Sequence, residues 1–161
     1  MVVGDFCRCR EPRGLNVTVK QCCLIVDDSE AVRKVMRHTI EGLGYEAGEA
    51  SNATDALARC KSKMPEVILL DWHLPGSSAF EFLGIVRSMP GGKLVKILYV
   101  ATNNDPVEIG RAIAAGANDH MIKPFRRVTL EAKIAQFTAK AREAQYDEDV
   151  KLPQRRLLRS Y

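Results

Sequence analysis

The chain has 161 residues, of which 46% are hydrophobic and 27% charged, so its composition predicts about one globular domain and excludes a disordered or fibrous chain. No apolar run approaches the roughly 18–20 residues of a transmembrane segment, and the first 20 residues hold charges and a proline instead of a signal segment, so we expect a soluble, cytoplasmic protein. The net charge of +4 divides into +2 over residues 1–20, +4 over residues 151–161 and −2 between them, so the body is mildly acidic and direct DNA binding is not expected.

Short runs rich in Val, Ile and Leu alternate with stretches of helical periodicity. The apolar runs are typical of strands covered on both faces and occupy residues 22–26, 45–50, 67–70, 95–100 and 120–122. The helical stretches occupy residues 31–43, 53–63, 79–86, 106–115 and about 128–146. Ser29 and Asn52 are expected helix caps, while Pro106 and Gly116 bound the fourth helix. This order predicts an α/β fold with a doubly wound, five-stranded parallel sheet.

Five cysteines are an odd number, and two of them, Cys22 and Cys23, fall in the first predicted strand. We therefore expect reduced thiols and not a disulfide framework. A zinc site formed with Cys7 and Cys9 is an alternative, but the C-x-C and C-C spacings lack the two-residue gap of common zinc sites.

Charged residues follow three of the predicted strands. Asp27 and Asp28 follow the first, Asp71 the third and Lys123 the fifth. The carboxyl ends of parallel strands share one rim, where ligands of such sheets bind. Three carboxylates there repel one another and need a cation, for which Mg²⁺ with its oxygen ligands is suited. With a lysine beside them, they predict phosphoryl transfer to an aspartate. Taken singly, these residues could be helix caps, a turn cap and a solvated charge.

Four segments carry a resemblance to a known family: Val26-Asp27-Asp28-Ser29, Leu69-Leu70-Asp71-Trp72-His73-Leu74-Pro75-Gly76, Ala114-Ala115-Gly116-Ala117-Asn118-Asp119 and Met121-Ile122-Lys123-Pro124-Phe125. In these the chain resembles a bacterial two-component response-regulator receiver domain, closest in plan to the stand-alone chemotaxis regulators. The resemblance implies a flavodoxin-like (βα)5 sheet with strand order 2-1-3-4-5. It divides the chain into an N-terminal extension (1–20), a receiver domain (21–146) and a basic tail (147–161).

The resemblance also implies a role for each residue of the rim. Asp71 is the expected phosphoacceptor. Asp28 would bind Mg²⁺ directly, Asp27 mainly through water, and the backbone carbonyl of His73 would complete the ligands together with Asp71. Lys123 would pair with the phosphoryl oxygens. The phosphate would come from a histidine kinase or phosphotransfer protein, and a downstream target protein would read the face of the fourth helix, fifth strand and fifth helix.

The chain departs from the family at two positions. Receivers carry Ser or Thr at the end of the fourth strand to contact the phosphoryl group, but Ala101 falls there. Either the readout of phosphorylation is blunted, or Thr102 reaches inward through a one-residue shift. His120 stands where the family has a switch aromatic, and it is either a pH-sensitive switch or a half-exposed strand residue. The family also implies a cis bond between Lys123 and Pro124.

Two other functions stay open. The tail carries Arg155, Arg156 and Arg159 around a Leu-Leu pair, so a receiver-like module independent of phosphorylation could bind a nucleotide second messenger such as cyclic di-GMP, or an acidic partner, through it. An aspartyl-phosphate phosphatase of the haloacid-dehalogenase type would need a second Asp where the chain has His73. We therefore expect phosphoacceptor chemistry and not an enzyme. We expect no output domain after about residue 146, and therefore expect output through protein contacts, competition for phosphate or the tail.

Overall fold

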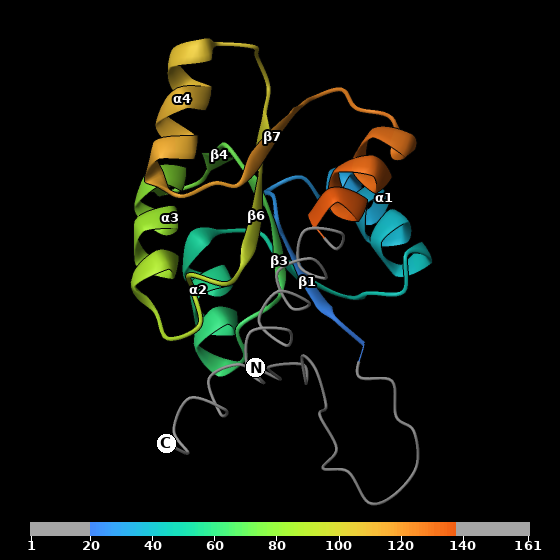
Figure 1. Ribbon diagram of the computed structural model, residues 1–161, viewed down its shortest axis with the longest axis horizontal. Helices are drawn as coiled ribbons and strands as arrows, with labels where there is room; N and C mark the ends of the chain where they lie inside the picture. Colours follow the sequence, from blue (N-terminus) through green and yellow to red (C-terminus); the bar gives the residue numbers. More distant parts are fainter. Residues whose placement is uncertain (1–19, 138–161) are drawn as a thin grey trace, which may run out of the picture.

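The computed structural model describes residues 20–137. In this part of the chain, the five strands of the main sheet alternate with five helices (Figure 1). The strands of the main sheet are β1 (Cys22–Val26), β2 (Glu46–Ala50), β3 (Val67–Asp71), β6 (Lys96–Ala101) and β7 (Asp119–Ile122). The helices are α1 (Glu30–Gly42), α2 (Ala53–Ser62), α3 (Ala79–Ser88), α4 (Pro106–Ala115) and the helical residues 127–137.

All neighbouring strands of the main sheet run parallel, in the order β2-β1-β3-β6-β7. This is the predicted order 2-1-3-4-5 once the strands of the main sheet are counted along the chain, so the fold prediction is confirmed. The order reverses between β1 and β3, which places a crevice at the carboxyl ends of these two strands. The structure adds one unpredicted element, an antiparallel pair of two-residue strands, β4 (His73–Leu74) and β5 (Ser77–Ser78), which follows β3 directly.

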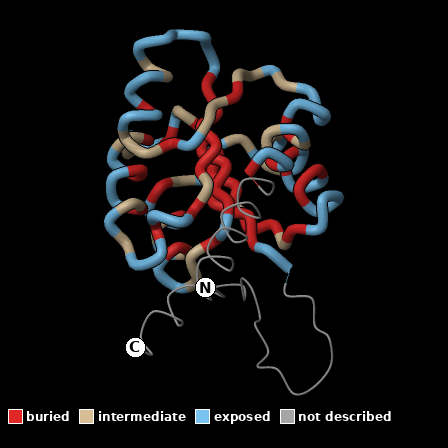
Figure 2. The backbone as a smooth tube through the Cα atoms, in the orientation of Figure 1, coloured by how far each residue is buried: buried red, intermediate tan, exposed pale blue. Residues whose placement is uncertain are grey.

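Helices cover both faces of the sheet, with α2, α3 and α4 on one face and α1 with residues 127–137 on the other (Figure 1). Successive side chains of β1 feed opposite cores because side chains alternate across a strand. Leu24 and Val26 pack with the first group of helices, whereas Cys23 and Ile25 pack with the second. All four are 0% exposed, and Figure 2 shows the buried strands enclosed by helices whose outer sides are exposed. Burial of each large side chain contributes about 1.5–3 kcal/mol.

Polar caps and a glycine set the helix boundaries. Ser29 and Asn52 cap α1 and α2 as predicted, since their side chains accept hydrogen bonds from the backbone amides of Val32 and Asp55. Gly116 ends α4 in the left-handed conformation, with φ at 119°. The two N-caps fix where the loops before α1 and α2 end, and Gly116 fixes where the loop after α4 begins.

Three predicted segments lie outside the described residues. They are the N-terminal extension (1–20, except residue 20), the end of the last helix, and the basic tail with Arg155, Arg156 and Arg159.

Cys23 and Cys60 are free and buried, and burial raises the pKa of the Cys60 thiol to about 11. Cys22 is disulfide-bonded, so the expectation of reduced thiols is wrong for that residue.

None of the helices within residues 20–137 combines the length and hydropathy that a bilayer crossing requires.

Candidate functional site

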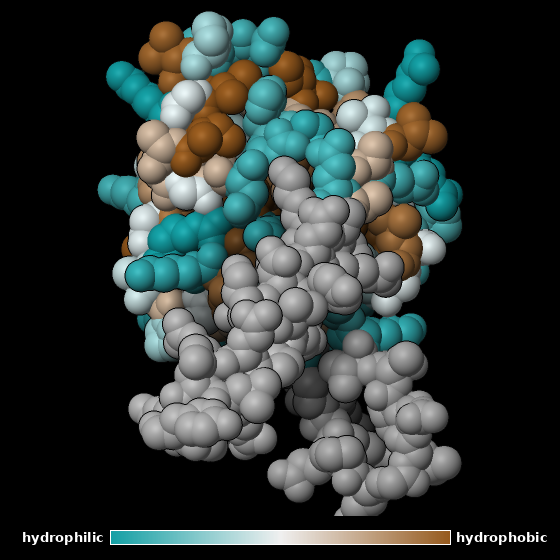
Figure 3. All heavy atoms as spheres, in the orientation of Figure 1, coloured by the Kyte–Doolittle hydropathy of each residue, from teal (hydrophilic) through white to brown (hydrophobic). Residues whose placement is uncertain are grey.

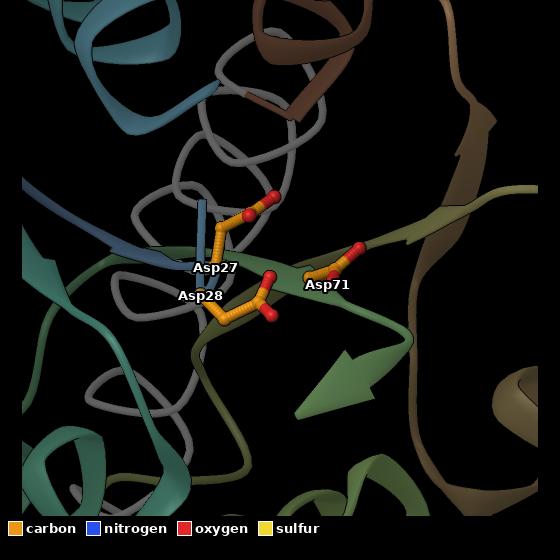
Figure 4. A group of neighbouring side chains, drawn as sticks. All are labelled: Asp27, Asp28 and Asp71. Carbon is orange, nitrogen blue, oxygen red and sulfur yellow. The ribbon is translucent and has the colours of Figure 1, made fainter. Parts of the chain in front are cut away.

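Three aspartates meet at the carboxyl edge of the sheet, beside the reversal of strand order. Asp27 and Asp28 follow β1, and Asp71 is the last residue of β3. One carboxylate oxygen from each lies within 4.8 Å of those of the other two, and Figure 4 shows the side chains gathered at one rim. Asp27 and Asp71 are buried, whereas Asp28 is exposed. The cluster therefore has two inner carboxylates and one that faces solvent.

Lys123 places its ammonium group between the two inner carboxylates. Its Nζ lies 2.6 Å from Asp27 Oδ2 and 2.8 Å from Asp71 Oδ1. The residue follows β7, where its backbone N–H donates to the carbonyl of Ala101 at 2.8 Å. The bond between Lys123 and Pro124 is cis, as the sequence resemblance implied. Residues from the ends of three strands thus meet in one group.

The inner groups have perturbed proton affinities. Burial raises the pKa of Asp71, repulsion from Asp27 adds to the rise, and hydrogen bonds from Lys123 and the His73 backbone oppose it. Burial acts to lower the pKa of Lys123, but its hydrogen bonds to Asp27 and Asp71 outweigh this and the pKa is raised. Lys123 therefore stays charged at neutral pH and offsets part of the negative charge of the cluster.

An arginine of α1 supports the backbone beneath the cluster. Arg33 Nη1 donates to the carbonyl oxygens of Asp27 at 2.8 Å and Asp28 at 3.2 Å, while its Nε donates to Glu49 at 3.2 Å. The amide N–H of Ser29 donates to Asp27 Oδ1 at 2.8 Å. These contacts fix the loop in which both aspartates lie. Sequence reasoning missed Arg33, because an arginine in an amphipathic helix is usually a solvated residue.

The donor set of the cluster fits a hard divalent cation. Carboxylate oxygens are the ligands that Mg²⁺ prefers, and its demand for retained waters suits a site with one solvent-facing side, which Asp28 provides. Among residues 20–137, this is the one group of three or more potential metal ligands close enough together to hold an ion. His73 follows two residues after Asp71 with its side chain exposed, and its backbone N–H binds the Asp71 carboxylate.

The two residues after Val100 differ in environment. Ala101 is 0% exposed and keeps regular pairing with Ile122, so the one-residue shift, which was one of the two alternatives at this position, is absent. Thr102 is exposed, and its hydroxyl accepts a hydrogen bond of 2.6 Å from the indole Nε1 of Trp72. The methyl group of Ala101 offers no hydrogen bond to a ligand at the rim. The nearest hydroxyl along the chain is therefore the one held by Trp72.

His120 and Tyr99 lie side by side on β7 and β6. The His120 side chain is 35% exposed, and its Nδ1 lies 3.8 Å from Asp119 Oδ1. Tyr99 is fully buried and donates its hydroxyl to Glu108 of α4 at 2.9 Å. The buried tyrosine thus ties β6 to the first turn of α4.

Comparison with known proteins agrees with this geometry. The family model of the response regulator receiver domain matches residues 23–135. The chain is 30% identical to the chemotaxis protein CheY1 of Helicobacter pylori over 113 residues, covering 69% of this chain and 91% of that protein. It is 29% identical to the phosphate regulon transcriptional regulatory protein PhoB of Rhizobium meliloti, covering 73% of this chain and 52% of that protein. The match thus spans about half the length of PhoB and of similar relatives such as MtrA.

Solved structures show the same architecture. The chemotaxis response regulator CheY4 of Vibrio cholerae superposes with a TM-score of 0.70 at 31% identity, covering 73% of this chain and 98% of that chain. A response regulator structure from Chloroflexus aurantiacus superposes with a TM-score of 0.70 at 29% identity.

Proposed function

Because the chain belongs to the response regulator receiver family, we propose that it accepts a phosphoryl group on Asp71 from a histidine kinase or phosphotransfer protein and signals through protein contacts. The observation that carries this proposal is the bridge from the Lys123 ammonium to Asp27 and Asp71 at the strand-order reversal, with the carboxylate of Asp28 beside them. A cytoplasmic location follows from this proposal, because such donors present their phosphate there.

The transfer would make one bond and break one. An Asp71 carboxylate oxygen forms the O–P bond while the P–N bond of a donor phosphohistidine breaks, and the bond electrons return to the imidazole nitrogen, which takes a proton. Lys123 holds the Asp71 carboxylate in place at 2.8 Å and is positioned to neutralise oxygens of the transferred group.

Asp27, Asp28 and Asp71, with the backbone of His73, are the proposed Mg²⁺ ligands. When bound, Mg²⁺ would neutralise the charge that develops on the phosphoryl oxygens. Asp28 would be its most solvent-accessible ligand, because it is the exposed member of the group. Asp27 contributes a carboxylate already oriented by Lys123 and Ser29.

The proposed output surface lies on α4, β7 and the start of the last described helix. Val107 and Ile113 of α4 are 62% and 43% exposed, and Val128 is 64% exposed. Figure 3 shows hydrophobic atoms at the upper left, where Figure 1 places α4. Large exposed apolar side chains are typical of protein-binding surfaces when they lie close together. A target protein is therefore the proposed reader of this surface.

We propose phosphoacceptor chemistry without turnover of external substrates. An aspartyl-phosphate phosphatase of the haloacid-dehalogenase type needs a second carboxylate two residues after its nucleophile, and here the exposed His73 occupies that position. Hydrolysis of a small phosphomonoester by the wild type and not by Asp71→Ala would instead support the phosphatase.

The test uses Trp72, the sole tryptophan of the chain, as a reporter beside Asp71. Mg²⁺ should change its fluorescence, and acetyl phosphate or beryllofluoride should change it further. Intact-mass analysis should show the addition of one phosphoryl group to the wild type. Asp71→Asn should abolish both the second fluorescence change and the mass gain.

Silence of the wild type in all three measurements would contradict the proposal. Such a result would favour a module independent of phosphorylation, a reading that the absence of a hydroxyl at Ala101 supports. A fluorescence or affinity change with a nucleotide or an acidic partner alone would then identify that module.

A further inference from the structure

Trp72 connects the loop after β3 to the loop after β6. Its backbone N–H donates to the carbonyl of Val100 at 2.9 Å, and its indole Nε1 donates to the Thr102 hydroxyl at 2.6 Å. The two contacts reach residues on either side of Ala101. Trp72, which directly follows Asp71, therefore holds the end of β6 at two points, one through its backbone and one through its side chain.

The direction of the indole hydrogen bond leaves the Thr102 hydroxyl a donor. An indole N–H can only donate, so the threonine oxygen must accept. A hydroxyl has one proton and two acceptor positions, so Thr102 keeps its own O–H for another acceptor. A phosphoryl group on Asp71 would bring strong acceptor oxygens to the same rim.

We infer that Trp72 is a positioning residue that holds the Thr102 hydroxyl ready to donate to a phosphoryl group on Asp71, in place of the hydroxyl that Ala101 lacks. The inference rests on the proposed function. Thr102 leaves the sheet edge without the one-residue shift that would otherwise be needed to bring a hydroxyl inward. The indole hydrogen bond of Trp72 instead fixes the position of the threonine oxygen from the side of β3, so the shift is not required.

The same contact offers a path from the phosphoacceptor to α4. Thr102 is followed by a loop in which Asn103 Oδ1 accepts from the amide N–H of Asp105 at 3.3 Å, and Asp105 caps α4 by accepting from the amide of Val107 at 2.9 Å. A shift of Thr102 toward a phosphoryl group would therefore be passed to the cap of α4. Val107 is also part of the proposed output surface.

Binding of beryllofluoride with Mg²⁺ to the full chain, measured by calorimetry, tests the inference. Thr102→Val removes the hydroxyl at nearly constant shape and should weaken binding about 10- to 100-fold, the effect of losing a hydrogen bond to a charged group. Thr102→Ser keeps the hydroxyl and should stay within about threefold of the wild type. Thr54→Val, an exposed threonine of α2, is the matched control and should bind as the wild type does.

Trp72→Phe distinguishes positioning from simple packing. In the wild-type background it should weaken binding by about 3- to 10-fold, because one neutral hydrogen bond is lost. In the Thr102→Val background it should have no further effect, because its action passes through the hydroxyl. Thermal unfolding of each variant establishes that it is folded before titration.

Three results separate the possible failures. An unchanged affinity in Thr102→Val overturns the inference and leaves the proposed function intact. An equal effect of Trp72→Phe in both backgrounds also overturns it, since packing and not the hydroxyl would then be responsible. A wild-type chain that does not bind beryllofluoride refutes the inference and the proposed function together.

Discussion

The substitution Asp71→Asn should stabilise the fold at neutral pH in the absence of Mg²⁺. Asp71 is 4% exposed. At an effective dielectric of about 20, its attraction to Lys123 at 2.8 Å is worth about 6 kcal/mol, and its repulsion from Asp27 within 4.8 Å about 3.5 kcal/mol. The remaining attraction, about 2.5 kcal/mol, opposes a burial cost of several kcal/mol for a carboxylate. The balance predicts a gain on the order of 1–3 kcal/mol for the neutral amide, consistent with the raised pKa of Asp71.

The pH dependence of the gain follows from the direction of that pKa shift. A carboxyl group whose pKa is higher in the folded state binds more protons when folded, so wild-type stability falls as pH rises from the ordinary value of about 3.9 through the raised pKa. The increase in the free energy of unfolding caused by Asp71→Asn should therefore be complete at pH values above the raised pKa and should disappear below the ordinary pKa of an aspartate. Urea unfolding of both proteins in EDTA at several pH values measures it, and thermal unfolding should show roughly 4 °C per kcal/mol.

A stabilisation that is absent at pH 7, or that stays constant down to the ordinary Asp pKa, would refute this reasoning. Asp55→Asn is a suitable control, because Asp55 is exposed on α2 and its carboxylate is distant in sequence from the cluster. It should leave the free energy of unfolding within about 0.5 kcal/mol of the wild-type value.

Other substitutions test the same site and its supports. Lys123→Met removes the cation between two buried carboxylates and should lower the free energy of unfolding in EDTA by on the order of 3 kcal/mol. Part of this loss should be recovered when Mg²⁺ is added. An equal loss with and without the ion would contradict the proposed metal site. Asp28→Asn should weaken the thermal stabilisation by Mg²⁺, whereas an unchanged Mg²⁺ titration would remove Asp28 from the ligand set. Gly116→Ala should lower the free energy of unfolding, measured in urea, by about 1–2 kcal/mol. Gly116 has a φ of 119°, and an added Cβ would lie 2.8 Å from Arg87 Cγ. An unchanged free energy of unfolding would show that the loop rearranges.

Local signals in the sequence explain why most of the fold was predictable. The bounds predicted for α4 agree with the structure, because Pro106 begins a helix and Gly116 ends one. The strands agree to within one residue at each end, since their apolar runs are short and bounded by polar residues. The pair β4 and β5 was missed because two-residue strands joined at Pro75-Gly76 leave no hydrophobic period to detect.

The site was predictable to the extent that parallel strands share one rim. That rule brings Asp27, Asp71 and Lys123 together without knowledge of any contact. The hydrogen bond between Trp72 and Thr102 joins residues 30 positions apart, and no local pattern specifies which loop side chains meet. The disulfide state of Cys22 was missed because an apolar context favours a free thiol.

The outer strands of the sheet restrict how copies of this chain can associate. β2, at one edge, carries Glu46 and Glu49 within five residues, and β7, at the other, has only four residues and is followed closely by Pro124, which has no N–H to donate. Acidic side chains, short length and proline all discourage a further strand from pairing with a sheet edge. We therefore expect self-association, where it occurs, to bring helices of two molecules together and not to extend the sheet from one molecule into the next.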